Sequence, residues 1–332
     1  MLKTPFYRCL AILTLLCSSA FAASPFAGDY ALALPGGAPG WLGVNEKDGK
    51  LSASMLWGWG SVFVLQPAAQ GDKLVLTRQI KEERKDADGK KTTILITETM
   101  TAALEGDAIK LATVKTRPDG STFGEAKFDG KRLPPMPPAP DLAKVKFGQP
   151  ISLFDGKGMD GWKLVDPKSI SGWSVKDGVL TNNPVQEEGK PHKNYGNLRT
   201  DREFEDFNFT CELSVPKGGN SGIYLRGIYE IQVADTFGKP LNAHNMGGIY
   251  SRITPTQAAE KPAGEWQTMD ITLVDRHITV ILNGKTIIDN HPVPGPTGGA
   301  LWADPFKPGP IYLQGDHTGV NYRNIVLKPV TK

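Results

Sequence analysis

Hydrophobic and polar residues alternate along residues 219–235, a pattern that predicts two neighbouring β-strands. One predicted face is apolar and carries Ile223, Leu225, Ile231 and Val233. The opposite face combines a small residue, an aromatic ring, a cation, a carboxylate and an amide: Gly222, Tyr224, Arg226, Glu230 and Gln232. A soluble domain ordinarily exposes such a face to water, but the same side chains suit a sugar-sized polar ligand.

Short apolar runs separated by turn dipeptides predict β-strands along the whole chain. The dipeptides are Asp48-Gly49, Asp88-Gly89, Asp119-Gly120, Asp129-Gly130, Asp177-Gly178 and Asn283-Gly284. No segment keeps a helical period for three turns. One short helix is predicted at 254–260, where Pro255 suits the first helical turn. The sequence therefore predicts an all-β protein.

A proline-rich stretch divides the chain into two β domains. Five of the seven residues in 134–140 are proline, which prevents helix or sheet and favours an extended spacer. We expect a small β-barrel or β-sandwich at 24–133, a linker at 134–147 and a second domain at 148–332. The tryptophans and glycines of 56–60 are expected to close the first domain's core. The alternative is that one of these tryptophans stacks on a sugar bound by the second domain.

Residues 1–22 have the features of a secretory signal peptide. Lys3 and Arg8 precede an apolar run at 9–16, and Ala20-Phe21-Ala22 supplies small residues for cleavage. The run is too short to cross a bilayer, so we expect no transmembrane segment in the mature chain. Cys17 leaves a lipid anchor as the alternative. We expect a secreted protein, in the periplasm or on the outer surface of a bacterial cell.

Removal of the predicted signal peptide changes the net charge and the number of cysteines, which bear on the binding partners and on disulfide formation. The formal charge falls from +3 by two cations to +1, and Cys211 is the cysteine that remains, so no internal disulfide is possible. A nearly neutral chain has no electrostatic reason to bind nucleic acid or an anionic membrane.

Short motifs in the second half occur together in one order. They are Ser152-Leu153-Phe154-Asp155-Gly156, Trp173-Ser174-Val175, Phe204-Glu205-Asp206-Phe207, Asn220-Ser221-Gly222-Ile223, Tyr229-Glu230-Ile231-Gln232-Val233-Ala234-Asp235, Gly248-Ile249-Tyr250, Glu265-Trp266-Gln267, Ile311-Tyr312-Leu313-Gln314 and Tyr322-Arg323-Asn324-Ile325. From about 149 to 330 the chain resembles the 3-keto-disaccharide hydrolases, a family of 3-keto-glycoside hydrolases and lyases. The resemblance implies a concanavalin-like jelly-roll sandwich that holds a small carbohydrate substrate on a concave sheet.

The resemblance also implies a chemistry. A ketone at C3 of the sugar acidifies the C2 hydrogen, so one general base can start an elimination that expels the aglycone from C1, with water added later. A cationic side chain or a divalent metal ion would hold the enediolate charge. Retaining glycosidases of this fold carry Glu-x-Asp-x-x-Glu on one strand, whereas this chain has one carboxylate and an amide on that strand face, at Glu230 and Gln232, which disfavours two-carboxylate hydrolysis.

The predicted catalytic residues are Glu230 as base or metal ligand, Arg226 as holder of the oxyanion, and His317 as base or ligand. A divalent metal ion is expected between Glu230, Asp235 and His244. The side chains expected to bind the substrate are those of Asn220, Tyr224, Gln232, Tyr250, Trp266 and Arg323.

Three alternatives remain open at this point. Glu230 and Arg226 could form a salt bridge on a wet sheet face. The protein could be a non-catalytic carbohydrate-binding module, which relies on exposed aromatic rings rather than buried charges. An adhesion or scaffold role would leave no ligand-sized pocket on the concave face. Lyase, hydratase and net hydrolase activities are all compatible with the residues.

Overall fold

The computed structural model describes residues 24–85 and 89–331. The predicted signal peptide and Cys17 lie outside these residues. Within the described part of the chain, no helix is long and apolar enough to cross a membrane. Cys211 is buried and unpaired.

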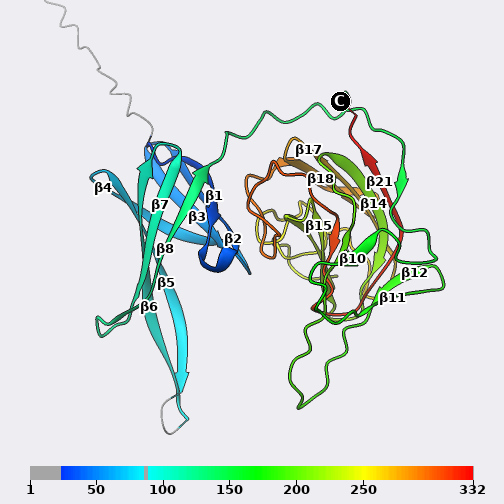
Figure 1. Ribbon diagram of the computed structural model, residues 1–332, viewed down its shortest axis with the longest axis horizontal. Helices are drawn as coiled ribbons and strands as arrows, with labels where there is room; N and C mark the ends of the chain where they lie inside the picture. The colour runs from blue at the N-terminus through cyan, green and yellow to red at the C-terminus, as the bar shows by residue number, and fades with distance from the viewer. Residues whose placement is uncertain (1–23, 86–88, 332) are drawn as a thin grey trace, which may run out of the picture.

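The first half is a closed antiparallel barrel in which β1 completes the ring by pairing with β8 (Figure 1). Its elements are β1 (Gly28–Ala33), the 3-10 helix η1 (Pro35–Gly37), β2 (Pro39–Lys47), β3 (Lys50–Trp57), β4 (Phe63–Gln70), β5 (Lys73–Lys85), β6 (Lys91–Glu105), β7 (Ala108–Thr116) and β8 (Thr122–Arg132). Asp48 and Gly49 join β2 to β3 with φ of 52° and 72°, as expected for a two-residue hairpin. Inward side chains such as Tyr30, Leu42 and Met55 fill the barrel.

The second half is a sandwich of two antiparallel sheets. The five-stranded sheet has the order β10 (Trp162–Leu164), β13 (Leu198–Thr200), β20 (Tyr312–Leu313), β15 (Asn220–Leu225), β16 (Tyr229–Ala234). The eight-stranded sheet has the order β11 (Trp173–Lys176), β12 (Val179–Asn182), β21 (Val320–Pro329), β14 (Phe207–Ser214), β17 (Gln267–Val274), β18 (His277–Leu282), β19 (Lys285–Pro292), with β9 (Ile151–Ser152) paired to β21. The chain is therefore all-β, with a jelly-roll sandwich after a barrel.

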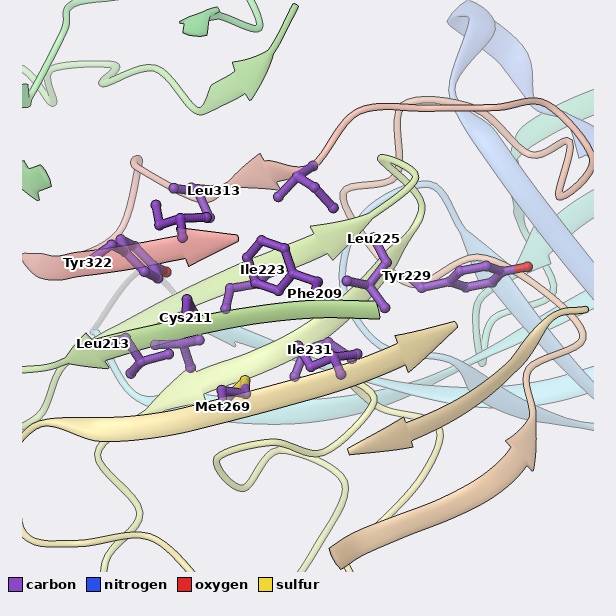
Figure 2. Packing of buried hydrophobic residues seen from close by; sticks show 14 of the residues in the cluster. Phe209, Cys211, Leu213, Ile223, Leu225, Tyr229, Ile231, Met269, Leu313 and Tyr322 are labelled. Carbon is purple, nitrogen blue, oxygen red and sulfur yellow. The ribbon is translucent and has the colours of Figure 1, made fainter. Parts of the chain in front are cut away.

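The sandwich core lies between the inner faces of its two sheets. Figure 2 shows Ile223, Leu225 and Ile231 from the five-stranded sheet packed together with Phe209 and Met269 from the other sheet. These side chains have at most 1% exposure. The apolar face predicted from the alternation of residues 219–235 is thus the core face.

Two local predictions are wrong. Asp129-Gly130 is not a turn but part of β8, where Gly130 pairs with Leu32 and a Cβ would lie 2.5 Å from that leucine's side chain. The predicted helix at 254–260 does not form. The Thr256 N–H instead donates to the carbonyl of Ile287 at 2.8 Å, so this segment is held by β19 rather than by its own backbone.

The barrel lies beside the sandwich (Figure 1), and side chains of both halves are in contact. The Arg252 guanidinium stacks over the Trp41 ring at 4.3 Å and donates two hydrogen bonds to the Pro296 carbonyl. Burial lowers the pKa of Arg252 to about 10. The 134–140 segment also touches the sandwich, because the Asn290 side chain donates to the Pro140 carbonyl at 2.9 Å.

Candidate functional site

Strand register assembles a polar surface on the outer face of the five-stranded sheet. Tyr224 of β15 lies opposite Glu230 of β16 on one side and opposite Tyr312 of β20 on the other. Gly222 lies opposite Gln232 in the same register. Since side chains alternate along a strand, these five residues project from one face. Tyr224, Glu230 and Gln232 are no more than 5% exposed, so this face is covered rather than wet.

The covered face borders a cavity of about 240 Å³. Its lining is Trp59, Gly60, Asn197, Asn220, Tyr224, Glu230, Gln232, Tyr250, Gly298, Gly299, Tyr312, Gln314, Asp316 and His317. The cavity is smaller than the roughly 300–1,000 Å³ typical of sites for drug-sized ligands. Its hydroxyl, amide and carboxyl groups match a compact polar ligand of sugar size.

Glu230 is the buried acid of this cavity. Its carboxyl group lies over Gly222, where an added Cβ would come within 2.4 Å of Oε1, so glycine is needed to leave room for it. Burial raises the pKa of Glu230 to about 8, opposed by the hydrogen bond from Tyr224 and by the nearby His317. A carboxyl group with such a pKa can exchange a proton near neutral pH.

The Tyr224 hydroxyl supports either protonation state of Glu230. It lies 2.8 Å from Oε2 of Glu230 and 2.7 Å from the Gly298 carbonyl oxygen. Its single proton can go to only one of these acceptors at a time. An ionised Glu230 accepts from Tyr224, whereas a protonated Glu230 can donate to the hydroxyl, which then donates to Gly298. Tyr312 stacks on Tyr224 with ring centroids 4.0 Å apart and keeps the phenol in place.

His317 and Asp316 form a second titratable pair at the cavity. The His317 Nδ1 lies 2.8 Å from Oδ1 of Asp316. This hydrogen bond, with the negative charges of Asp316 and Glu230, raises the pKa of His317 above its ordinary value, against the opposing effect of burial. Of the described side chains that line the cavity, only that of His317 has a cationic form.

Amide and phenol groups complete the lining. The Gln232 Nε2 donates to Oδ1 of Asn220 at 3.0 Å, while the Gln232 Oε1 is buried without a partner. A buried acceptor without a donor favours a ligand hydroxyl in its place. Tyr250 lines the same cavity.

Arg226 is not where the alternation placed it. β15 ends at Leu225, and Arg226 and Gly227 turn the chain with φ of 53° and 68°. The Arg226 Nη2 donates to the Lys307 carbonyl at 2.9 Å, and Arg226 does not line the cavity. The structure therefore gives Arg226 neither a salt bridge with Glu230 nor an oxyanion to hold.

Trp266 and Arg323 also lie elsewhere. The Arg323 guanidinium stacks over the Trp266 ring at 4.0 Å and pairs with Glu212 at 2.6 Å, on the eight-stranded sheet. Neither residue borders the cavity. Arg323 belongs to β21 and Trp266 directly precedes β17, and both strands are in the eight-stranded sheet, whereas the cavity lies on the five-stranded sheet.

The three side chains expected to hold a metal ion are not brought together. Only Glu230 lines the cavity. The Asp235 carboxylate accepts from the Gly218 N–H at 2.8 Å, and His244 Nε2 lies 3.2 Å from the Ser61 hydroxyl. Among residues 24–85 and 89–331, no group of three or more His, Cys, Asp or Glu side chains could hold a metal. This ligand set does not fit a divalent ion.

Several lining residues were not candidates from the sequence. Tyr312, Gln314 and Asp316 stand at every second position of the chain, as residues on one face of a strand do. This alternation is the sequence pattern that could have predicted them as lining residues. Asn197 and Gly298 lie in segments whose proximity to Glu230 is set only by the fold. The sequence predicts that Trp59 helps to close the barrel core, but this side chain is 72% exposed and lines the cavity instead.

Comparison with known proteins identifies the second half. The profile of the 3-keto-alpha-glucoside-1,2-lyase-like domain matches residues 149–328, more than half of the chain. The chain belongs to this family. The match contains both sheets of the sandwich apart from the last residue of β21, and leaves out the barrel with Trp59 and Gly60.

Individual relatives match the same region. A 3-keto-disaccharide hydrolase of Bacteroides thetaiotaomicron is 26% identical over 168 residues, which cover 42% of this chain and 58% of that relative, less than two thirds of its length. Two crystal structures from Parabacteroides distasonis ATCC 8503 are assigned as glycosyl hydrolases. One is 30% identical with a TM-score of 0.44, covering 59% of this chain and 93% of its own. The other is 28% identical with a TM-score of 0.41, covering 54% and 98%.

Proposed function

We propose that this protein is a secreted carbohydrate-active enzyme that cleaves 3-keto-glycosides by eliminating the aglycone from C1. Membership of the 3-keto-alpha-glucoside-1,2-lyase-like family supports the substrate class. The single observation that carries the mechanism is Glu230, a buried carboxyl group with a pKa of about 8 at the cavity. Strand β16 presents one carboxyl group to the cavity, and the other acid of the lining, Asp316, is hydrogen-bonded to His317 at 2.8 Å, which supports elimination over double displacement by a pair of free carboxylates.

The elimination balances without an added reactant. A carboxylate at Glu230 takes the C2 proton of the 3-keto sugar, and the freed electron pair forms a C1–C2 double bond. The C1–O bond breaks, and the aglycone oxygen leaves with a proton from an acid. The products are an unsaturated keto sugar and the aglycone alcohol. Addition of water across the double bond in a later step would give net hydrolysis.

Glu230 is suited to the role of base. The C2 hydrogen is a weak acid, and the power of a general base rises with its pKa. A carboxylate of ordinary pKa would be ionised but weakly basic, whereas Glu230 combines a carboxylate with a pKa of about 8. The cost is that only a minority of molecules carry an ionised Glu230 at neutral pH.

His317 is suited to the role of acid. Its raised pKa keeps the imidazolium form more populated at neutral pH. The imidazolium cation would also stabilise the negative charge that develops on the sugar. Asn220 and Gln232 supply amide groups for sugar hydroxyls. Protein groups alone carry the proposed steps.

A non-catalytic carbohydrate-binding module is the rival function. A binding platform depends on exposed aromatic rings, and Trp59 at the cavity is such a ring. Burying a carboxyl group, however, costs stability that a platform has no reason to spend. The cavity also argues against a role in adhesion or as a scaffold. The enzyme is the better-supported proposal.

The deciding experiment incubates purified mature protein with 3-keto-trehalose, with and without a chelator. We expect loss of the keto-glycoside and release of glucose in both samples. Binding of the keto-glycoside without release of glucose would favour the module instead. Loss of activity with chelator would return a metal ion to the mechanism.

Export is part of the proposal. It is supported by the pattern of residues 1–22. The intact mass of protein from the periplasmic fraction should correspond to a chain that begins near Ala23. A mass that retains residues 1–22 or adds a lipid at Cys17 would contradict export of a cleaved soluble chain.

A further inference from the structure

Trp59 is an unusual residue of the barrel. It occupies the middle of Gly58-Trp59-Gly60, between β3 and β4, with φ of 63° and 80° at the two glycines. The neighbouring Trp57 packs edge-on against Phe128 in the barrel core, whereas Trp59 is 72% exposed. A large indole left in water contributes nothing to the barrel's own core. Yet this indole borders the cavity that contains Glu230.

The loop that carries Trp59 is held against the cavity wall. The Gly60 backbone lies so close to Gly298 that an added Cβ on Gly298 would come within 2.1 Å of the Gly60 carbonyl oxygen. The Gly299 N–H donates to the Gly58 carbonyl at 3.3 Å. Gly298 and Gly299 themselves line the cavity, and Gly298 accepts from Tyr224. The backbone on both sides of Trp59 is therefore positioned relative to the residues that surround Glu230.

Further contacts restrict movement of this loop. The Val62 N–H donates to the Ser251 hydroxyl at 2.6 Å, and Ser61 lies 3.2 Å from His244. The buried stack of Arg252 on Trp41 holds the barrel against the sandwich nearby. A loop whose backbone is fixed before a ligand arrives loses little conformational freedom when the ligand binds.

The cavity lining includes one deeply buried group and one exposed ring, which suit different parts of a glycoside. The reacting sugar must bring its C2 hydrogen to Glu230, which is 3% exposed. The aglycone leaves first, so it has to lie toward solvent, where Trp59 is 72% exposed. An indole face packs on the C–H face of a sugar ring or on another apolar ring by burial and dispersion.

We propose that Trp59, a residue outside the family domain, forms the aglycone subsite of the active site and makes the barrel a determinant of specificity. This inference rests on the proposed function. It predicts a preference for glycosides whose leaving group is itself a ring. The barrel then supplies one wall of the site, and the sandwich supplies the reacting groups.

The test compares two substrates that share the 3-keto-glucosyl group, methyl 3-keto-glucoside and 3-keto-trehalose. The proteins are wild type, Trp59→Ala, Trp59→Phe and the control Trp266→Ala, whose indole lies on the other sheet. Trp59→Ala should lower kcat/KM for 3-keto-trehalose about tenfold, mainly through KM, and change that for the methyl glycoside less than about twofold. Trp59→Phe should fall between, and Trp266→Ala should leave the ratio of the two values unchanged.

The outcomes separate the subsite from the proposed function. If wild type cleaves both substrates but Trp59→Ala keeps their ratio unchanged, the aglycone subsite is wrong and the enzyme stands. A selective loss in Trp266→Ala as well would also overturn the subsite. If wild type cleaves neither substrate, the proposed function fails and the aglycone subsite with it. Thermal unfolding of each variant shows whether a loss of activity is due to misfolding. If Trp59→Ala does not fold, the ratio of the two kcat/KM values is compared between wild type and Trp59→Phe.

Discussion

The two sheets of the sandwich carry similar polar side chains on their outer faces but treat them in opposite ways. On the five-stranded sheet, burial raises the pKa of Glu230 to about 8. On the eight-stranded sheet, hydrogen bonds from Arg323 and Asn324 lower the pKa of Glu212. Among the described residues, the Glu230 carboxyl group accepts a hydrogen bond from a phenol, whereas the Glu212 carboxylate accepts from a guanidinium and an amide.

The difference shows how burial of a sheet face changes the pKa of a carboxyl group on that face. Tyr250, Gly298 and Gly299 of the sandwich and Trp59 and Gly60 of the barrel line the same cavity as Glu230, which is 3% exposed. The Glu212 side chain keeps 26% of its surface and a partner of opposite charge, the usual state of a surface glutamate. The opposite pKa shifts of these two glutamates therefore follow from burial at Glu230 and from hydrogen-bond donors at Glu212.

The largest expected effect tests this contrast directly. Glu230→Gln removes the charge but keeps the size, so cleavage of 3-keto-trehalose should fall about a hundredfold or more while the fold survives. Glu212→Gln is the matched control, and it should leave turnover unchanged and cost less than about 1 kcal/mol of stability. Turnover and thermal unfolding are measured on the same preparations. Near wild-type cleavage by Glu230→Gln would end the assignment of the base.

The space that Gly222 leaves for Glu230 offers a second test. In Gly222→Ala the new Cβ would meet Oε1 of Glu230, so the carboxyl group must move. We expect a loss of about tenfold to a hundredfold in kcat, because displacing a catalytic group by about 1 Å is costly. Gly158→Ala is the control, since a Cβ there meets nothing within 4 Å. Equal activities of the two variants would show that the carboxyl position is unimportant.

The pH dependence of activity should sharpen the comparison. If ionised Glu230 is the base and protonated His317 is the acid, kcat/KM rises with pH as Glu230 ionises and falls at higher pH as His317 loses its proton, which gives a bell-shaped profile between about pH 5 and 10. A rate profile of wild type beside Glu230→Gln checks this, because the residual activity of the variant should not follow the same rise. A wild-type profile that is flat across this range would contradict a base with a raised pKa.

The pH dependence of stability should have opposite signs on the two sheets. The folded pKa of Glu230 is raised, so its contribution to stability is fully present below its unfolded pKa of 4.5 and is lost as pH rises through about 8. The folded pKa of Glu212 is lowered, so its contribution is present above 4.5 and is lost as pH falls through the folded pKa. Unfolding temperatures of wild type, Glu230→Gln and Glu212→Gln between pH 3 and 9 would reveal these trends, and trends of equal sign would refute them.

The smallest effect is expected at Arg323. Arg323→Lys keeps the charge but loses the forked contact with Glu212 and the stack on Trp266. Stability should change by less than about 1 kcal/mol, and cleavage of 3-keto-trehalose should not change, since this face is remote from the cavity. A marked fall in kcat/KM for 3-keto-trehalose would mean that the substrate contacts the eight-stranded sheet.

Much of the fold was predictable because its signals are local. The alternation at 219–235 is a property of neighbouring residues, and it correctly separated the core face with Ile223 and Ile231 from the face with Tyr224 and Glu230. Asp48-Gly49 marked its hairpin because Asp and Gly tolerate positive φ. The turn predicted at Asp129-Gly130 is wrong because the sequence does not distinguish two roles of glycine. Gly130 makes room for the Leu32 side chain within a strand, whereas Gly49 turns the chain.

The site was predictable only in part, because it depends on residues far apart in sequence. Asn220, Tyr224, Gln232 and Tyr250 were named from one stretch of sequence and do line the cavity. Arg226 followed the alternation one residue too far, since the chain turns there. Arg323 and Trp266 have suitable chemistry on the wrong sheet.

The sequence by itself determined the all-β class, the apolar and polar faces of β15 and β16 and the presence of an acid at Glu230, because strand period and turn chemistry act over a few residues. Only the tertiary structure decided that the polar face would be covered, that Asp316 would pair with His317 at the cavity of Glu230, and which tryptophan of the first domain would reach that cavity. The pKa of a carboxyl group depends on everything packed around it, and in this protein that packing is contributed by segments more than a hundred residues apart.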